Sequence, residues 1–280
     1  MREPTTAGVW GAAGCVRRGV LWYIREMLTA ITRNVSSALA CCELSFIERK
    51  PIDMEKARAQ HHAYEEALEK LGARVISLPE EPELPDSMFV EDPAIVLDEV
   101  AVICPLGTDL RRKEAPSIRA ALEEFRKLAH VKLPGTLEGG DVLRVDKKVF
   151  VGITARSNPE GIRQLAVILE HFRYDLTAVP VGGCLHLKSA VTYLGRNTLL
   201  ANRDWFDWKR LEGFDWVDVD PSEPHAGNAL AVGGSVIFPS SFPKTRARIE
   251  AREFKVLSLD IGELQKAESG LTCSSLLFEA

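Results

Sequence analysis

The feature of this sequence that most restricts its fold is a unit that recurs about every 45 residues. In each unit, two short apolar segments flank a polar turn, as residues 94–97 and 100–103 flank Asp98 and Glu99. Residues 116–129 follow with the apolar spacing of an amphipathic helix. The same order recurs over residues 142–172, where Asn158 and Pro159 begin a helix, over 185–200, and over 229–252. The pattern predicts consecutive ββαβ units.

A fifth unit is divided between the two ends of the chain. Residues 273–278 are expected to pair with residues 28–32, and a helix over 53–71 completes the unit. Pairing the first and last strands would close a ring and remove exposed sheet edges. We therefore expect an α/β fold, a five-bladed propeller with pseudo-five-fold symmetry, closed by its N- and C-terminal strands. Residues 27–280 would form a single catalytic domain, and residues 1–26 a disordered extension or a mis-assigned start.

The composition is that of an ordinary globular protein, with 27% charged and 46% hydrophobic residues. A net charge of −5 argues against a nucleic-acid partner, and no apolar segment approaches the roughly 20 residues of a membrane helix. The six cysteines include the adjacent Cys41 and Cys42 but no C-x-x-C spacing. This usage predicts a reduced, cytoplasmic protein. The sequence leaves the oligomeric state open, with a homodimer among the assemblies considered.

Polar residues open one apolar segment in each unit. They are Glu91 with Asp92, Glu138, His186, Asn228 and Cys273. In a closed ring these positions would converge on one axial channel. A cysteine and a histidine at equivalent positions indicate nucleophilic thiol catalysis, with Cys273 as the nucleophile and His186 as general acid and base. Glu138 would orient the imidazole, and Gly139 and Gly140 would allow the backbone to approach it closely.

The paired acids Glu91 and Asp92 enter a buried strand, where charge requires a reason. Two carboxylates in a channel would bind a guanidinium or ammonium group through charge-assisted hydrogen bonds. Arg111, Arg112 and Arg156 follow the hairpins and would together hold a substrate carboxylate. A metal site built on Cys41-Cys42, His61-His62 and His225 is the alternative, but adjacent pairs lack the spacing of structural zinc ligands.

Several motifs resemble those of the dimethylarginine dimethylaminohydrolases of the guanidino-group-modifying superfamily. They run in family order across residues 27–280, at residues 85–93, 110–114, 135–141, 155–158, 185–188 and 270–273. The resemblance implies hydrolysis of asymmetric dimethylarginine or monomethylarginine to citrulline and a methylamine, without metal or cofactor. It implies a covalent thiouronium on Cys273, with His186 moving the protons and Glu138 orienting it.

The resemblance also assigns the substrate contacts. Glu91 and Asp92 match the acids that bind the guanidinium group. Asp86, Arg111 and Arg156 match the residues that hold the amino-acid end, and Leu39 and the backbone of Ala267 match further contacts.

Two alternatives stay open at this point. The first is hydrolysis of another guanidine, arginine or agmatine, although arginine deiminases typically carry a helical insertion for which this chain has no room. The second is a catalytically silent guanidine-binding protein, which the presence of Cys273, His186 and the acids disfavours.

Overall fold

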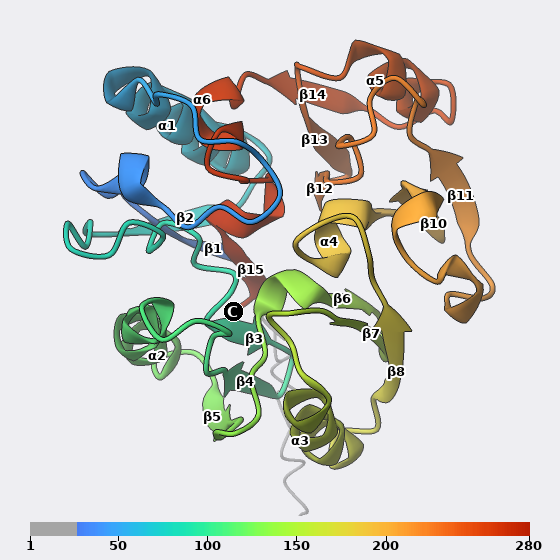
Figure 1. Cartoon of the computed structure of the whole chain (residues 1–280). Coiled ribbons are helices and arrows are strands. Elements are labelled where there is room, and N and C mark those ends of the chain that lie inside the picture. Colours follow the sequence, from blue (N-terminus) through green and yellow to red (C-terminus); the bar gives the residue numbers. More distant parts are fainter. Residues whose placement is uncertain (1–26) are drawn as a thin grey trace, which may run out of the picture.

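The computed structural model describes residues 27–280, so the expected extension over residues 1–26 lies outside the described residues. Five three-stranded sheets make up the fold. In each sheet the middle strand is antiparallel to one neighbour and parallel to the other. Figure 1 shows the sheets arranged about a common centre with the longer helices outside them. The predicted α/β class is confirmed.

The strands follow the predicted units closely. The sheets are β15 (Leu276–Glu279), β1 (Leu28–Arg33) and β2 (Arg74–Leu78); β3 (Ala94–Val96), β4 (Val100–Ile103) and β5 (Lys127–His130); β6 (Val142–Val145), β7 (Lys148–Ile153) and β8 (Asp175–Pro180); β9 (Val191–Gly195), β10 (Thr198–Ala201) and β11 (Asp215–Asp218); and β12 (Leu230–Val232), β13 (Ser235–Pro239) and β14 (Val256–Leu259). The predicted pairing of the chain ends is confirmed, because β1 lies antiparallel to β15 with Ile31 opposite Leu276.

Four longer helices connect the strands: α1 (Met54–Lys70), α2 (Ala115–Leu122), α3 (Pro159–Glu170) and α5 (Pro243–Glu250). Two shorter ones are α4 (Leu187–Ala190) and α6 (Gly262–Gln265). The predicted start of α3 is confirmed, since the Asn158 side chain accepts a hydrogen bond from the Gly161 N–H at 2.8 Å and Pro159 occupies the first turn. Within the described part of the chain, no helix combines the length and apolar character needed to cross a membrane.

Two sequence predictions about helices are wrong. The helical pattern over residues 116–129 extends too far, because α2 ends at Leu122 and Leu128 lies in β5, paired with Ala101 of β4. Pairing with a neighbouring strand overrides the helical spacing there. In addition, β10 and β11 are joined by two 3-10 turns, Arg203–Trp205 and Trp208–Arg210, in place of a helix. The Asn202 side chain accepts from the Asp204 N–H, a local bond that competes with helix formation.

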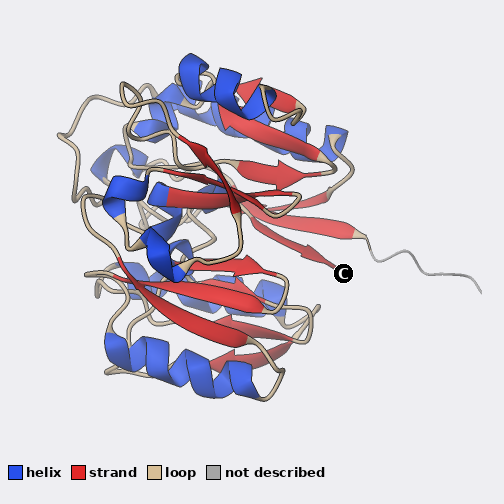
Figure 2. Ribbon diagram, turned by 90° about the vertical axis from the view of Figure 1, so that its right-hand side faces the viewer, coloured by secondary structure: helices blue, strands red, loops and turns tan. Residues whose placement is uncertain are grey.

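The buried apolar residues form five clusters, and each cluster contains residues of two sheets. Ile31 of β1 clusters with Ala101 of β4, and Val102 of β4 with Val151 of β7. The remaining three clusters join Phe150 of β7 to Leu199 of β10, Leu200 of β10 to Val236 of β13, and Ile237 of β13 to Ala30 of β1. Figure 2 shows helices along the upper and lower outer sides of the strands. Every sheet therefore shares an apolar core with two others.

Candidate active site

The polar residues singled out in the sequence occupy matching places in the fold. Glu91 and Asp92 precede β3, Glu138 precedes β6, Asn228 precedes β12 and Cys273 precedes β15. The apolar segment that His186 opens begins as a helix and not as a strand, since His186 is the N-cap residue of α4, which leads directly into β9. The short helix is an addition to this unit, and it still leaves His186 ahead of the first strand of its sheet.

A cavity of about 300 Å³ brings several of these residues together. Cys273, His186, Glu91 and Asn228 line it from the central positions. Phe46, Ile47 and Glu268 line it from surrounding loops, and Trp205, His225 and Phe242 add aromatic surface. The cavity thus combines a thiol, an imidazole and a carboxylate with apolar walls, as expected for a small-molecule site.

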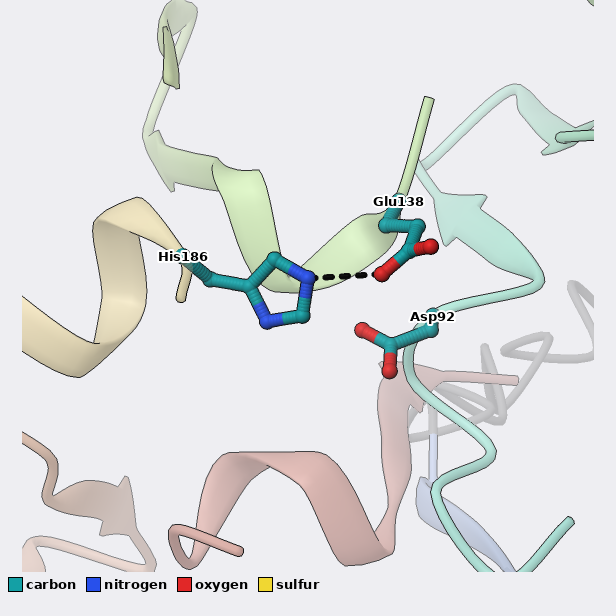
Figure 3. Close-up of side chains that lie close together, drawn as sticks. All are labelled: Asp92, Glu138 and His186. Atoms are coloured by element: carbon teal, nitrogen blue, oxygen red, sulfur yellow. Dashed lines mark hydrogen bonds and ion pairs between the residues drawn. The ribbon is translucent and has the colours of Figure 1, made fainter. Parts of the chain in front are cut away.

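His186 forms a hydrogen-bonded ion pair with Glu138. The His186 Nε2 and Glu138 Oε2 atoms lie 2.7 Å apart, and Figure 3 shows the two side chains facing each other with Asp92 beside them. Burial lowers the pKa of His186, but the carboxylates of Asp92, Asp141 and Glu138 outweigh it and raise that pKa to about 9. Burial raises the pKa of Glu138, whereas the bond to His186 lowers it to about 2. The histidine is therefore an imidazolium at neutral pH.

Two glycines allow this pair to form. A Cβ atom on Gly139 would lie 1.9 Å from the carbonyl oxygen of Glu91, and one on Gly140 would lie 2.7 Å from His186 Nδ1. The Gly139 N–H donates to the Asp92 carbonyl at 3.0 Å, and the Gly140 N–H donates to Asp92 Oδ1 at 3.1 Å. The backbone after Glu138 therefore packs directly on Glu91 and Asp92, which only residues without a side chain permit.

Cys273 lies in the 3-10 turn Thr272–Ser274 and is partly exposed. The Gly270 N–H donates to its Sγ atom at 3.4 Å. Burial raises the pKa of Cys273 to about 12, and the negative charges of Glu91 and Asp92 add to this increase. The thiol is therefore protonated at neutral pH until a positive charge enters the cavity.

Glu91 is already paired with two residues that sequence reasoning did not select. The Lys188 Nζ forms an ion pair with Glu91 Oε1, and the Thr272 hydroxyl donates to Glu91 Oε2 at 2.8 Å. Burial raises the pKa of Glu91, and the Lys188 charge offsets part of that increase. Both residues lie inside the motifs at 185–188 and 270–273, so their position next to His186 and Cys273 was an available signal.

Arg111 does not line the cavity, and it is only 4% exposed. Its Nη1 lies 3.0 Å from Asp92 Oδ2, and its Nε and Nη2 donate to Glu114 at 3.1 and 3.0 Å. Arg111 Nη1 is also 3.8 Å from Glu138 Oε2. This guanidinium therefore holds Asp92 in place beside the His186–Glu138 pair. Sequence reasoning missed Glu114, although it closes the 110–114 motif.

Asp86 and Arg156 are buried and also lie outside the cavity wall. Arg156 Nη1 lies 3.2 Å from Glu43 Oε2 and 3.5 Å from Glu138 Oε1. Asp86 accepts a hydrogen bond from the Glu43 N–H. Leu39 and Ala267 are buried in one apolar cluster and do not line the cavity. Arg112 donates to the Leu106 carbonyl and pairs with Asp109.

Asp92, Glu138 and His186 are a group that could hold a metal ion, with ligand atoms within 4.8 Å of one another. Their charges are already paired, since Glu138 binds the His186 imidazolium and Asp92 binds Arg111. A cationic ring is a poor ligand, so these residues do not fit a resident metal. Within residues 27–280, Cys41, Cys42 and the histidines of the alternative prediction form no metal-binding group.

Comparison with known proteins shows the family to which the chain belongs. A family model described as N,N dimethylarginine dimethylhydrolase, eukaryotic, matches residues 43–274. The chain belongs to the dimethylarginine dimethylaminohydrolase family.

Two bacterial relatives and one solved structure agree with this placement. The N(G),N(G)-dimethylarginine dimethylaminohydrolase of Pseudomonas aeruginosa is 34% identical over 228 residues, which cover 81% of this chain and 90% of that protein. The Streptomyces coelicolor protein of the same name is 34% identical over 248 residues, 88% of this chain and 95% of that one. A cysteine-to-serine variant of the Pseudomonas aeruginosa enzyme, solved with citrulline, has a TM-score of 0.84 and 31% identity, covering 90% of this chain and all of that one.

Proposed function

We propose that this protein hydrolyses Nω-methylated arginine, that is asymmetric dimethylarginine and monomethylarginine, to citrulline and dimethylamine or methylamine. The observation that carries the proposal is the shared cavity of Cys273, His186 and Glu91, in a chain 34% identical to named dimethylarginine dimethylaminohydrolases. The complex of one such enzyme with citrulline supports the product.

Cys273 is proposed as the nucleophile. A guanidinium group beside Glu91 brings positive charge next to the thiol, which favours loss of its proton to solvent. The thiolate then forms an S–C bond to the guanidinium carbon, and the imidazolium of His186 gives its proton to the departing amine as the C–N bond breaks. A cationic thiouronium remains on Cys273, and His186 is neutral.

The second half of the reaction returns the enzyme to its starting state. Neutral His186 takes a proton from water, and the hydroxide adds to the thiouronium carbon. Collapse of this adduct breaks the S–C bond and releases citrulline, while the proton of the adduct's hydroxyl passes to the sulfur and regenerates the Cys273 thiol. Glu138 stabilises the imidazolium whenever it forms, as its 2.7 Å contact with His186 Nε2 supports.

The remaining residues that the sequence motifs single out are proposed to bind the substrate. Glu91, which lines the cavity, and Asp92, beside His186, would hold the guanidinium group. Buried Asp86 and Arg156, with Arg111, would hold the amino-acid end, because both arginines lie close to Glu138 and Asp86 offers the opposite charge. Leu39 and Ala267 would support the loop behind that end from their shared apolar cluster.

We propose that residues 27–280 form one domain whose five sheets close into an α/β propeller. The pairing of β1 with β15 supports the closure of the chain ends. The five apolar clusters support the ring, since each joins two sheets and the order returns from β13 to β1. The free thiols of Cys41, Cys42, Cys104, Cys184 and Cys273 support a reducing compartment, the cytoplasm.

Citrulline release tests the proposed reaction. Purified protein is assayed with asymmetric dimethylarginine, monomethylarginine, arginine and agmatine at equal concentrations. We expect turnover of the two methylated arginines, and a covalent mass increase on Cys273 when the reaction is quenched. Turnover of arginine or agmatine without turnover of methylated arginine would refute the proposed substrate. Full activity of Cys273→Ser would refute the nucleophile.

A further inference from the structure

Glu43 makes two contacts with residues to which we assign the amino-acid end of the substrate. It lies on the loop between the 3-10 turn Leu39–Cys41 and α1. Its Oε2 atom lies 3.2 Å from Arg156 Nη1. Its backbone N–H donates to the Asp86 carboxylate, at 3.1 Å from Oδ2 and 3.3 Å from Oδ1.

These two contacts reproduce the chemistry of a free amino-acid end. Such an end offers N–H donors on its ammonium group and acceptor oxygens on its carboxylate. Glu43 offers a donor to buried Asp86 and a carboxylate to buried Arg156, so each partner already has the polarity of group that it would bind in a substrate.

The loop that carries Glu43 is also held in place by Glu268, which lies near the other end of the chain. The Glu268 carboxylate accepts the backbone N–H groups of Ser45 at 3.0 Å and Ile47 at 2.9 Å, and also that of Phe46. Phe46, Ile47 and Glu268 line the cavity, whereas Asp86 and Arg156 do not. The loop therefore contacts both the cavity and the two charged residues.

We propose that Glu43 is a specificity-determining residue that occupies the amino-acid subsite of the free enzyme and is displaced by the carboxylate of the substrate. The inference rests on the proposed function. Displacement exchanges one carboxylate for another on Arg156, so the guanidinium keeps its counter-charge. The substrate must still replace an existing contact, and this competition raises its apparent dissociation constant.

A guanidine without an α-carboxylate has nothing to exchange for Glu43. It leaves the Glu43–Arg156 pair intact and binds through its guanidinium group and, where it has one, its ammonium group. Glu43 therefore weakens binding of amino-acid substrates relative to their decarboxylated counterparts. Removal of its charge increases the preference of the enzyme for the full amino acid.

The test compares Glu43→Gln with a matched control, Glu48→Gln, on the same loop. Glu48 is exposed and takes part in no ion pair among residues 27–280. For asymmetric dimethylarginine, we expect KM to fall about three- to tenfold in Glu43→Gln with little change in kcat, because a charge-assisted contact no longer competes. The KM for dimethylagmatine, and both constants of Glu48→Gln, stay at the values of the unmodified protein.

A binding measurement separates this inference from the proposed reaction. In the Cys273→Ser background, Glu43→Gln is expected to tighten citrulline binding about three- to tenfold by calorimetry. Unchanged citrulline affinity and KM would overturn the role of Glu43, and weaker binding would show that Glu43 contacts the bound substrate instead. Failure of the unmodified protein to turn over any methylated arginine refutes the reaction, while the citrulline comparison still decides the role of Glu43. Glu43→Asp, whose carboxylate is one methylene shorter, replaces Glu43→Gln if that variant is unstable.

Discussion

The protonated state of Cys273 in the free enzyme leads to a reactivity that depends on the charge of the reagent. Its pKa of about 12 leaves about 3,000-fold less thiolate at pH 7 than an ordinary exposed thiol with a pKa of about 8.5. Thiolates of higher pKa are more nucleophilic, with a Brønsted slope of about 0.4–0.5, which recovers part of this loss. A neutral alkylating reagent such as iodoacetamide should therefore modify Cys273 about 100-fold more slowly than an exposed thiol.

A cationic reagent should reverse this order. Chloroacetamidine carries an amidinium group that fits beside Glu91, where its charge opposes the two carboxylates that raise the pKa of Cys273. Cys41 is exposed and provides a reference within the same molecule. Peptide mass spectrometry after timed quenching gives the two modification rates at once, so differences in reagent reactivity cancel in the ratio of Cys273 to Cys41.

Glu91→Gln tests the electrostatic cause directly. Loss of this charge lowers the pKa of Cys273 and leaves the Lys188 ammonium group unpaired nearby, so iodoacetamide should modify Cys273 about threefold faster or more. The same variant loses the anion that attracts the amidinium group, so chloroacetamidine should modify Cys273 more slowly. Equal modification rates of Cys273 and Cys41 by iodoacetamide in the unmodified protein would refute the reasoning. The reasoning would also fail if Glu91→Gln changed the rates of modification of Cys273 by the two reagents in the same direction.

Two further predictions concern the residues around His186. Glu138→Gln should lower kcat about 10²- to 10⁴-fold, because the imidazolium loses the partner that stabilises it; a circular dichroism melt checks folding, and kcat within about twofold of the original value would contradict the assigned role. Since Glu138 helps to raise the pKa of His186 and catalysis needs the imidazolium, kcat of the unmodified enzyme should fall at alkaline pH, and this alkaline limb should move to lower pH in Glu138→Gln. Gly139→Ala should lower the free energy of unfolding by about 1–3 kcal/mol in urea titrations, because its Cβ would overlap the Glu91 carbonyl; Gly182→Ala, where a Cβ meets open space, is the matched control, and equal stabilities of the two variants would argue against the close contact.

The sequence alone determined the repeating units and the positions that carry reactive residues. Turn residues between apolar segments and the Asn158 cap are local signals, because they depend on neighbours a few residues away. They located the hairpins and the four longer helices, although the predicted end of α2 lay too far along the chain. They also placed Cys273, His186 and Glu91 at equivalent positions that meet in one cavity. The same local signals failed at Leu128, where pairing with β4 decided the structure.

Only the tertiary structure decided which charges meet. Arg156 faces Glu43 across more than a hundred residues of sequence, and Glu268 binds the backbone of Ser45 from the other end of the chain. No spacing rule connects such residues, because their distances depend on how the sheets pack on one another. The pKa values follow from these distances, since Coulomb energy and desolvation depend on separation and burial in space. The sequence thus supplied the thiol and the histidine, and the fold set their protonation states and placed Glu43 on Arg156 and Asp86.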